Sequence, residues 1–223
     1  NTGSAANPSF IELTGTNNPF ASFAFGNRGY VKATFADIDS DGKLDIAVGS
    51  RSFQYPINTR QIQFLKNIST SPSNLQFETV TGSYNPFESL PNFDNNQAAP
   101  TPTFTDVDKD GKTDLVVVSD RANGIPRYFK NIATNNTSIA QYQEVTSSAN
   151  PFGNVSSSRN SSYASLSFID IDGDGEAEVI SNENLETIAV YKNTSSIASA
   201  PVYVKQTEYI FSNKVIAGSL ANY

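Results

Sequence analysis

The stretch FADIDSDGKLDIAVGS, at residues 35–50, decides the fold class of this chain. It contains an Asp-rich turn between two short apolar segments, and the β-branched residues of the second segment indicate strands. Similar stretches follow twice: FTDVDKDGKTDLVVVSD at residues 104–120 and FIDIDGDGEAEVIS at residues 168–181. The turns begin at Asp37, Asp106 and Asp170, which are 69 and 64 residues apart. The chain is therefore built from repeats.

Three further markers keep the same order in every repeat. Asn-Pro-Phe precedes each turn, an aromatic residue with Lys-Asn follows it, and an alternating apolar–polar segment precedes each Asn-Pro-Phe. The Asn-Pro-Phe markers are at 18–20, 85–87 and 150–152, the Lys-Asn markers at 64–67, 129–131 and 191–193, and the alternating segments at 10–14, 77–81, 142–146 and 203–207. The chain thus has three Asp-rich turns but four alternating segments, one before the first turn and one after each turn.

The pattern inside each repeat is all-β, because no stretch has helical periodicity and Asn, Gly, Ser and Pro fill the links. Four antiparallel strands in a unit of roughly 65 residues are typical of one blade of a β-propeller. We therefore expect an all-β fold of three propeller-type blades, with an extra N-terminal strand and a non-repeating, apolar C-terminal tail. The predicted boundaries are 1–20 for the N-terminal strand, 21–87, 88–152 and 153–207 for the repeats, and 208–223 for the tail.

The Asp-rich turns have the pattern of a calcium loop. Carboxylates at positions 1, 3 and 5 converge on one point, Gly at position 6 permits a sharp turn, position 7 offers its backbone carbonyl, and an acid at position 9 completes the shell. Such hard oxygen ligands favour calcium, and we expect up to three structural Ca²⁺ ions. The predicted ligands are Asp37, Asp39, Asp41, Lys43, Asp45, Asp106, Asp108, Asp110, Lys112, Asp114, Asp170, Asp172, Asp174, Glu176 and Glu178.

Two alternatives bear on these loops. An EF-hand would need Glu at position 12 and flanking helices, but position 12 is Val48, Val117 or Ser181. An acidic Asp-Gly turn without metal is the other alternative, and three such turns in phase make it the weaker one. Because the ligands come from one contiguous loop, we expect the ions to be structural rather than catalytic.

The composition narrows the function classes. Loop positions 1, 3, 5 and 9 hold 12 of the 22 acidic residues, so the remaining 10 face 15 Lys and Arg and the net charge of −7 belongs to the loops. The chain has no His or Cys and no Gly-x-Ser-x-Gly or phosphate-loop motif, so we expect no enzyme. We also expect no nucleic-acid partner and no membrane span. The absence of Met favours a removed secretory signal, or else a trimmed chain.

The three loop stretches, with the Asn-Pro-Phe and aromatic-Lys-Asn segments, resemble the FG-GAP/VCBS repeat family of integrin-α-like β-propeller repeats. The resemblance covers nearly the whole chain. It implies blades with calcium between their first two strands, an extracellular or cell-surface location, and adhesion, ligand binding or scaffolding. It does not imply one activity. Family propellers commonly close with about seven blades, whereas this chain has three sets of strands.

The surplus alternating segment leads to the first hypothesis on function. A terminal strand or the apolar tail of one subunit would complete the open blade of the next, giving a head-to-tail fibre or a closed oligomer. The alternatives are a fragment of a longer propeller, or three blades that close within the chain. A lectin-like module is the second hypothesis, with Tyr84, Phe93, Tyr128 and Tyr163 as candidates to stack on glycans or, as the simpler interpretation, to pack in the core.

N-glycosylation is a further candidate feature. Asn-x-Ser/Thr sequons occur at Asn67, Asn135, Asn136, Asn154, Asn160 and Asn193. This number is close to the chance expectation from the Asn, Ser and Thr content. The sequons are therefore candidate sites without enrichment.

Overall fold

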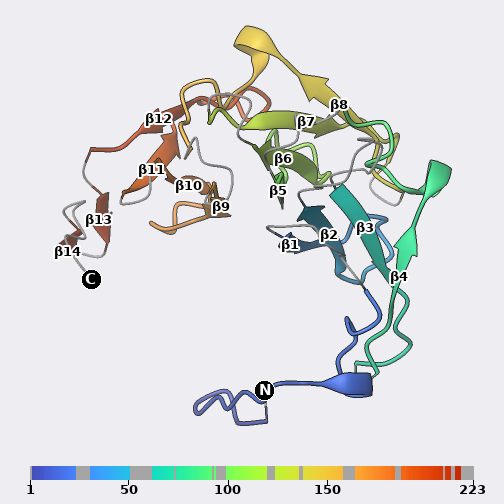
Figure 1. Ribbon diagram of the computed structural model, residues 1–223. Coiled ribbons are helices and arrows are strands. Elements are labelled where there is room, and N and C mark those ends of the chain that lie inside the picture. Colours follow the sequence, from blue (N-terminus) through green and yellow to red (C-terminus); the bar gives the residue numbers. More distant parts are fainter. Residues whose placement is uncertain are drawn as a thin grey trace.

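The computed structural model describes residues 2–23, 31–50, 62–72, 74–91, 93, 99–119, 124–135, 138–157, 164–183, 187–207, 209–211 and 214–216. Within these residues the chain forms three four-stranded antiparallel sheets and one two-stranded hairpin (Figure 1). The predicted all-β class is confirmed. The described residues contain no helix that is both long and apolar enough to cross a membrane.

Each four-stranded sheet takes its strands in chain order, so every connection inside a sheet joins neighbouring antiparallel strands. Sheet 1 contains β1 (Val31–Ala36), β2 (Asp45–Ser50), β3 (Ile62–Asn67) and β4 (Phe77–Val80). Sheet 2 contains β5 (Thr101–Thr105), β6 (Asp114–Val118), β7 (Arg127–Asn131) and β8 (Tyr142–Val145). Sheet 3 contains β9 (Leu166–Ile169), β10 (Glu178–Asn182), β11 (Ile188–Asn193) and β12 (Tyr203–Lys205).

The second strand of each sheet lies inside the sheet, between the first and third strands. In β6 all five residues are buried, because both faces of sheet 2 are covered. Leu115 and Val117 pack in the core shared with sheet 1, and Val116 and Val118 pack in the core shared with sheet 3. A continuous apolar run, rather than an alternating one, is what a strand buried on both faces requires.

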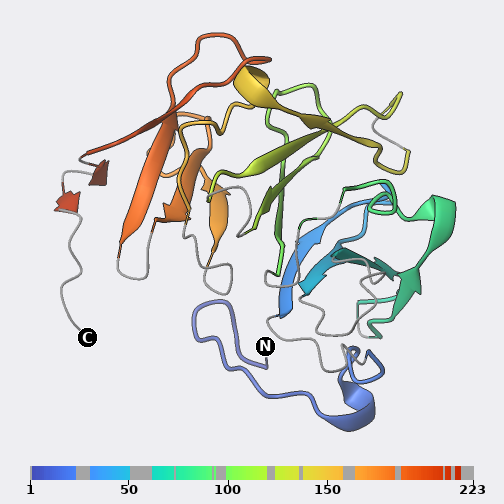
Figure 2. The same cartoon turned by 45° about the horizontal axis from the view of Figure 1, so that its top comes forward.

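The sheets follow one another along an open arc (Figures 1 and 2). Their first strands come together at its inner side, since β5 contacts both β1 and β9. There the Lys32 ammonium of β1 donates to the carbonyl of Ala164, 3.1 Å away and just before β9. Thr103 of β5 likewise donates to the carbonyl of Leu166, 3.2 Å away. First strands packed in this way leave the fourth strands at the outer side.

The Asn-Pro-Phe segments at 85–87 and 150–152 are turns that lead from one sheet into the next. The Asn85 side chain accepts the backbone N–H of Phe87 at 3.0 Å, which directs the ring inward. The Phe87 ring lies 6.2 Å from Phe64 of sheet 1 and 6.1 Å from Tyr142 of sheet 2. The phenylalanine therefore fills the space between two sheets.

Three-residue 3-10 turns precede these segments: η1 (Gly15–Asn17), η2 (Gly82–Tyr84) and η4 (Ser147–Ala149). In the first Asn-Pro-Phe, Phe20 contacts Phe77 of β4 with ring centroids 5.2 Å apart. Phe20 is 37% exposed, whereas Phe87 is 3% exposed. No sheet precedes sheet 1 among the described residues, so Phe20 covers one sheet and has none on its other side.

The predicted N-terminal strand is wrong. Residues 10–14 form no strand, although the other three alternating segments form β4, β8 and β12. Those three pair with the third strand of their own sheet. Phe10 is 79% exposed and Ile11 61% exposed. Strand geometry depends on hydrogen bonding to a neighbour, and none of the described strands pairs with the segment 10–14.

The tail begins with a hairpin of its own. β13 (Tyr209–Phe211) pairs antiparallel with β14 (Lys214–Ile216) as a separate two-stranded sheet. Residues 208, 212, 213 and 217–223 of the predicted tail lie outside the described residues. The predicted division of the chain into units at residues 20, 87, 152 and 207 stays a prediction.

Candidate metal sites

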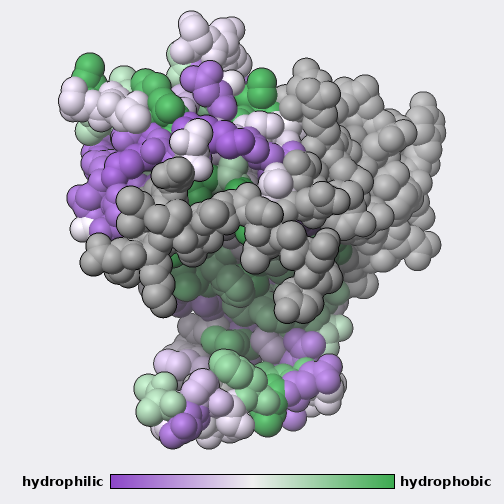
Figure 3. All heavy atoms as spheres, turned by 90° about the vertical axis from the view of Figure 1, so that its left-hand side faces the viewer, coloured by the Kyte–Doolittle hydropathy of each residue, from purple (hydrophilic) through white to green (hydrophobic). Residues whose placement is uncertain are grey.

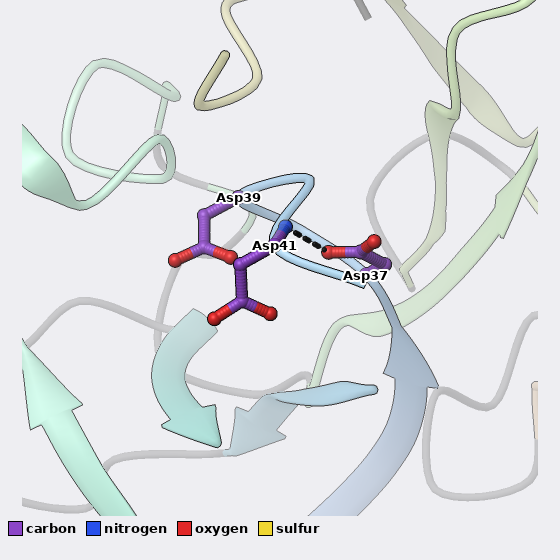
Figure 4. A group of neighbouring side chains, drawn as sticks. All are labelled: Asp37, Asp39 and Asp41. Carbon is purple, nitrogen blue, oxygen red and sulfur yellow. Dashed lines mark hydrogen bonds between the residues drawn. The ribbon is translucent and has the colours of Figure 1, made fainter. Parts of the chain in front are cut away.

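The Asp-rich turns connect the first and second strands of their sheets: loop 1 (residues 37–45), loop 2 (106–114) and loop 3 (170–178). In loop 1 the carboxylates of Asp37, Asp39 and Asp41 come from one turn of the chain (Figure 4). One ligand atom from each lies within 4.8 Å of the others. The corresponding groups are Asp106, Asp108 and Asp114 in loop 2 and Asp170, Asp172 and Glu178 in loop 3. Each loop therefore brings three acids together.

Position 1 shapes the loop through its backbone hydrogen bonds. The Asp37 carboxylate accepts the N–H of Asp41 at 3.0 Å and the N–H of Gly42 at 2.9 Å. Gly42 has a φ of 84°, a conformation that glycine adopts without strain. Asp106 in loop 2 and Asp170 in loop 3 accept the same kind of bonds. The glycine at position 6 thus allows the turn that brings the carboxylates together.

The acid at position 9 ties the loop to the third strand. Asp45 is fully buried and accepts the N–H of Ile38 at 3.0 Å and the N–H of Asn67 at 2.8 Å. Burial raises the pKa of Asp45 to about 6, and the nearby charges of Asp39 and Asp41 act in the same direction. A cation bound nearby would stabilise the charged carboxylate form of Asp45.

Asp114 occupies the same position in loop 2. It accepts hydrogen bonds from the N–H of Asn131 at 2.7 Å and the hydroxyl of Tyr128 at 2.9 Å. Burial raises its pKa to about 6 as well, against the effect of these hydrogen bonds. Asp45 and Asp114, which close loops 1 and 2, therefore have similar electrostatic surroundings.

Each loop contains a buried carboxylate oxygen without a hydrogen-bond partner. These atoms are Asp39 Oδ1, Asp108 Oδ1 and Glu178 Oε1. The side chain of Asp39 is 8% exposed, Asp108 is 7% exposed and Glu178 is fully buried. An unpaired charged oxygen in such a place is costly, and a bound cation removes that cost. The donor set of every loop therefore fits a hard divalent ion such as Ca²⁺.

The third strands supply lysines that were not predicted as part of the site. Lys66 of β3 binds the carboxylates of Asp39 and Asp41, and Lys130 of β7 binds those of Asp108 and Asp110. In loop 3 the Lys192 ammonium lies 2.6 Å from Asp172 and 2.7 Å from Asp174. These are the lysines of the aromatic-Lys-Asn marker, so their spacing to the loops was visible in the sequence.

These contacts change the titration of the groups involved. The hydrogen bond to Asp39 raises the pKa of Lys66, and that to Asp172 raises the pKa of Lys192. Burial would raise the pKa of Asp41, but the hydrogen bonds from Lys43 and Lys66 outweigh it and lower that pKa. Asp41, at position 5 of loop 1, is therefore held as a carboxylate.

Position 7 differs between the loops. The ammonium groups of Lys43 and Lys112 lie 3.4 Å and 3.1 Å from the carboxylates of Asp41 and Asp110. Glu176 of loop 3 instead pairs with Lys109 of loop 2. The predicted role of the position 7 carbonyls in ligation stays a prediction. Asp45, Asp110 and Asp174 were predicted as ligands and lie outside the three-acid groups.

The aromatic glycan-stacking candidates divide into two kinds. Phe93 is 3% exposed and packs against Phe129 at 5.6 Å, and Tyr128 is 4% exposed. Both belong to the core, which agrees with the simpler interpretation. Tyr84 is 71% exposed, and Tyr163 lies outside the described residues.

The sequons also differ in their surroundings. Asn67 is 9% exposed and its amide donates to the carbonyl of Leu44 at 3.0 Å, so this side chain has a structural role at the end of β3. Asn193 accepts the N–H of Val202 at 3.0 Å. Asn135 and Asn154 are exposed. Asn136 and Asn160 lie outside the described residues.

A cavity of about 660 Å³ opens beside loop 2, at the outer junction of sheets 2 and 3. Its lining combines charged, hydroxyl and amide groups with small apolar side chains. Residues that line it include Asp108, Lys130, Ser148, Asn154, Ser199 and Pro201.

Comparisons with known proteins agree with the repeated loops. A family profile described as FG-GAP-like repeat matches residues 106–181, which run from loop 2 through loop 3 into β10. Neither the curated proteins nor the solved structures gave a match. The matched stretch contains loops 2 and 3, whose carboxylates converge in the structure. Over this stretch the chain is similar to the FG-GAP-like repeat.

Proposed function

We propose that this chain is a secreted, calcium-stabilised structural or adhesive module without catalytic activity. Its three sheets act as propeller-type blades that join head to tail with other copies. The observation that carries the proposal is repeated three times: a buried, unpaired carboxylate oxygen inside each converging acid group. The extracellular location rests on the FG-GAP-like repeat, which is typical of extracellular proteins.

Calcium suits the loops better than magnesium or a transition metal. Each loop offers four or five carboxylates and no nitrogen or sulfur ligand, and crowded carboxylates suit the higher coordination number of Ca²⁺. The ion would join the first, second and third strands, because Asp45 and Asp114 already bond to the backbone of Asn67 and Asn131. Its role is to brace the strands of one sheet.

The calcium part is tested by thermal unfolding with excess calcium and with excess chelator. Because the ion binds the folded state, its removal lowers the melting temperature. Asp108→Asn, which changes the acid with the unpaired oxygen in loop 2, reduces the shift between the two conditions. Glu78→Gln on β4 is the matched control, since Glu78 is exposed and lies outside the loops. The same melting temperature in excess calcium and in excess chelator would contradict structural calcium.

The two ends of the arc present incomplete faces. Phe104 and Phe168 pack against the cores between sheets, but the corresponding Phe35 of β1 is 56% exposed. At the other end, Ile188 of β11 is 65% exposed and Val204 of β12 is 42% exposed. The interfaces inside the chain pack one face of a sheet against a face of the next. A second copy placed in the same way would cover both ends.

Residues 10–14 are the segment best suited to reach that second copy. They have the alternating pattern of β4, β8 and β12, yet they pair with no strand among the described residues of their own chain. The segment projects below the sheets in Figure 1, and Figure 3 shows apolar groups among polar ones on this lowest part of the molecule. We expect it to add to sheet 3 of the neighbouring copy by strand addition.

Sedimentation and electron microscopy of the full chain test the assembly. We expect oligomers or filaments at micromolar concentration, and we expect Phe10→Lys with Leu13→Lys to abolish them. Both side chains are exposed in the single chain, so the double variant keeps the melting temperature of the monomer. Leu75→Lys is the control, because Leu75 is 47% exposed and lies in the link between β3 and β4. A monomer with intact termini at these concentrations would refute the assembly.

Glycan binding is the second candidate, favoured by the cavity beside loop 2. Asn154 and Ser148 offer amide and hydroxyl groups there, and Pro201 offers an apolar surface. A glycan array with the full chain tests it, with Ser148→Val and Asn154→Leu expected to lose any saturable signal. Glu78→Gln is the control, since Glu78 is exposed and is not among the residues that line the cavity.

A further inference from the structure

Every loop of this chain has a lysine from the third strand bound to its position 3 and position 5 carboxylates. We infer that Lys66, Lys130 and Lys192 are resident cations that stabilise the empty loops and weaken divalent ion binding, and that loop 3 has the highest affinity of the three. The inference rests on the proposed calcium binding, and it adds which residues set the affinity of each loop.

The lysine and the divalent ion use different oxygens of the same carboxylate. Lys66 binds Oδ2 of Asp39, while Oδ1 of Asp39 is buried without a partner. Lys130 divides Asp108 in the same way, with Oδ2 bound and Oδ1 unpaired. The ammonium group therefore stands beside the ion position without filling it. A positive charge so close to a divalent ion opposes its binding.

The same ammonium group explains how the loops keep their shape when no ion is bound. Four carboxylates on one short turn repel one another, and Lys66 and Lys130 each place one positive charge against two of them. Removal of the lysine should therefore have two opposite effects. The affinity for calcium rises, and the stability of the calcium-free protein falls.

The net charge of each loop and its contacting lysines predicts the order of calcium affinity among the three loops. Loops 1 and 2 each have four acids and two contacting lysines, because position 7 is Lys43 or Lys112. Loop 3 has five acids, because position 7 is Glu176. Two of them, Asp172 and Asp174, contact Lys192 of β11. Lys109 of loop 2 pairs with Glu176, yet the charge of loop 3 stays the most negative. Loop 3 is therefore expected to fill first.

Calcium titration followed by NMR separates the three loops in the full chain. The position 6 glycines Gly42, Gly111 and Gly175 donate their amides to the position 1 acids, so each reports on its own loop. The Phe10→Lys, Leu13→Lys variant serves as the background if the chain assembles. We expect the Gly175 signal to shift at the lowest calcium concentration. Equal midpoints, or a lower midpoint at Gly42 or Gly111 than at Gly175, would overturn the ranking.

Two substitutions test the charges themselves. Lys66→Gln should raise the calcium affinity at Gly42 by about tenfold, the order that one nearby unit charge produces, and leave Gly175 unchanged. Glu176→Lys should lower the affinity of loop 3 to that of the other loops. Lys205→Gln is the control, since Lys205 pairs with Glu183 away from the loops. A lower affinity after Lys66→Gln would overturn the inference and make the lysine a positioning residue.

The calcium-free protein gives a second, independent readout. Lys66→Gln should lower its melting temperature, whereas Lys205→Gln should lower it less. An unchanged melting temperature would overturn the role of Lys66 as a resident cation even if calcium binds as proposed. Calcium-independent spectra at all three glycines would instead refute the proposed calcium function, so the two failures are distinguishable.

Discussion

The ring of Phe152 stacks on the ring of Tyr203, with centroids 5.1 Å apart and 12° between their planes. Phe152 belongs to the turn after sheet 2, and Tyr203 begins the last strand of sheet 3. The same phenylalanine lies 5.9 Å from Tyr128 of sheet 2. One side chain therefore connects two sheets, and its counterpart Phe87 does so between sheets 1 and 2.

Phe152→Ala should be strongly destabilising. Phe152 is fully buried between two sheets, and truncation of such a phenylalanine typically costs about 3–5 kcal/mol. Phe20→Ala should cost less than about 1 kcal/mol in the monomer, because Phe20 is 37% exposed and contacts one sheet. Urea unfolding of both variants measures the difference. Equal costs would show that Phe20 is buried in the same way as Phe152.

Gly49→Ala should separate sheets 1 and 2. A Cβ at Gly49 would lie 1.8 Å from the carbonyl oxygen of Pro100, which is backbone and cannot move aside. We expect a loss of about 2 kcal/mol or more, the range of overpacking in a tight interior. Gly153→Ala is the matched control, because its nearest neighbour is the Asn150 carbonyl at 3.5 Å. Chemical denaturation that finds the two variants alike would contradict this close approach.

The calcium-free protein should lose stability as the pH rises from 4 to 7. Burial raises the pKa of both Asp45 and Asp114 to about 6. The folded state thus binds these protons more tightly than the unfolded state. Their stabilising effect is complete below a pH near 4 and is lost as the pH passes 6. Each group contributes up to about 3 kcal/mol, from roughly two pKa units at 1.36 kcal/mol each.

Urea midpoints at pH 5 and pH 7 check this trend after the metal has been removed. The groups with lowered pKa, such as Asp41 and Glu183, lose their contribution only at lower pH, below the ordinary carboxylate range. Added calcium should reverse the order of the two midpoints, since the ion binds the deprotonated acids. A metal-free midpoint that is higher at pH 7 would contradict the raised pKa values.

Arg127→Lys should weaken the outer part of sheet 2. The Arg127 guanidinium makes a two-bond ion pair with Glu144 at 2.7 Å and 2.8 Å and lies 5.0 Å from the Phe93 ring centre. Lysine keeps the charge but makes neither the paired bonds nor the stacking, so we expect a loss of about 1 kcal/mol. A double-mutant cycle with Glu144→Gln measures the coupling. No coupling would mean that the pair is fully screened by solvent.

The sequence was sufficient for the order of the strands. The apolar runs after each acidic turn form β2, β6 and β10, and the aromatic-Lys-Asn markers end β3, β7 and β11. These strands could be predicted because their own residues and the adjacent turn residues favour strand structure. Residues 10–14 have the same local pattern and form no strand, because a strand depends on a partner that the pattern itself does not encode.

The candidate site was predicted in part. The acids and the position 6 glycines are contiguous in the chain, so the loop pattern located them. Lys66, Lys130 and Lys192 come from another strand, and their contacts depend on the antiparallel pairing of the third strand with the second. The buried state of Asp45 also depends on packing from both neighbours, which no local pattern expresses.

The shared phenylalanine between consecutive sheets has a mechanical consequence. A pulling force applied to the two ends of the chain reaches sheet 2 through the turns that carry Phe87 and Phe152. Each turn can yield only when its ring leaves two sheets at once, whereas Phe20 has a single sheet to leave. Under load, a single chain should extend in separate steps that begin at sheet 1, where Phe20 contacts one sheet.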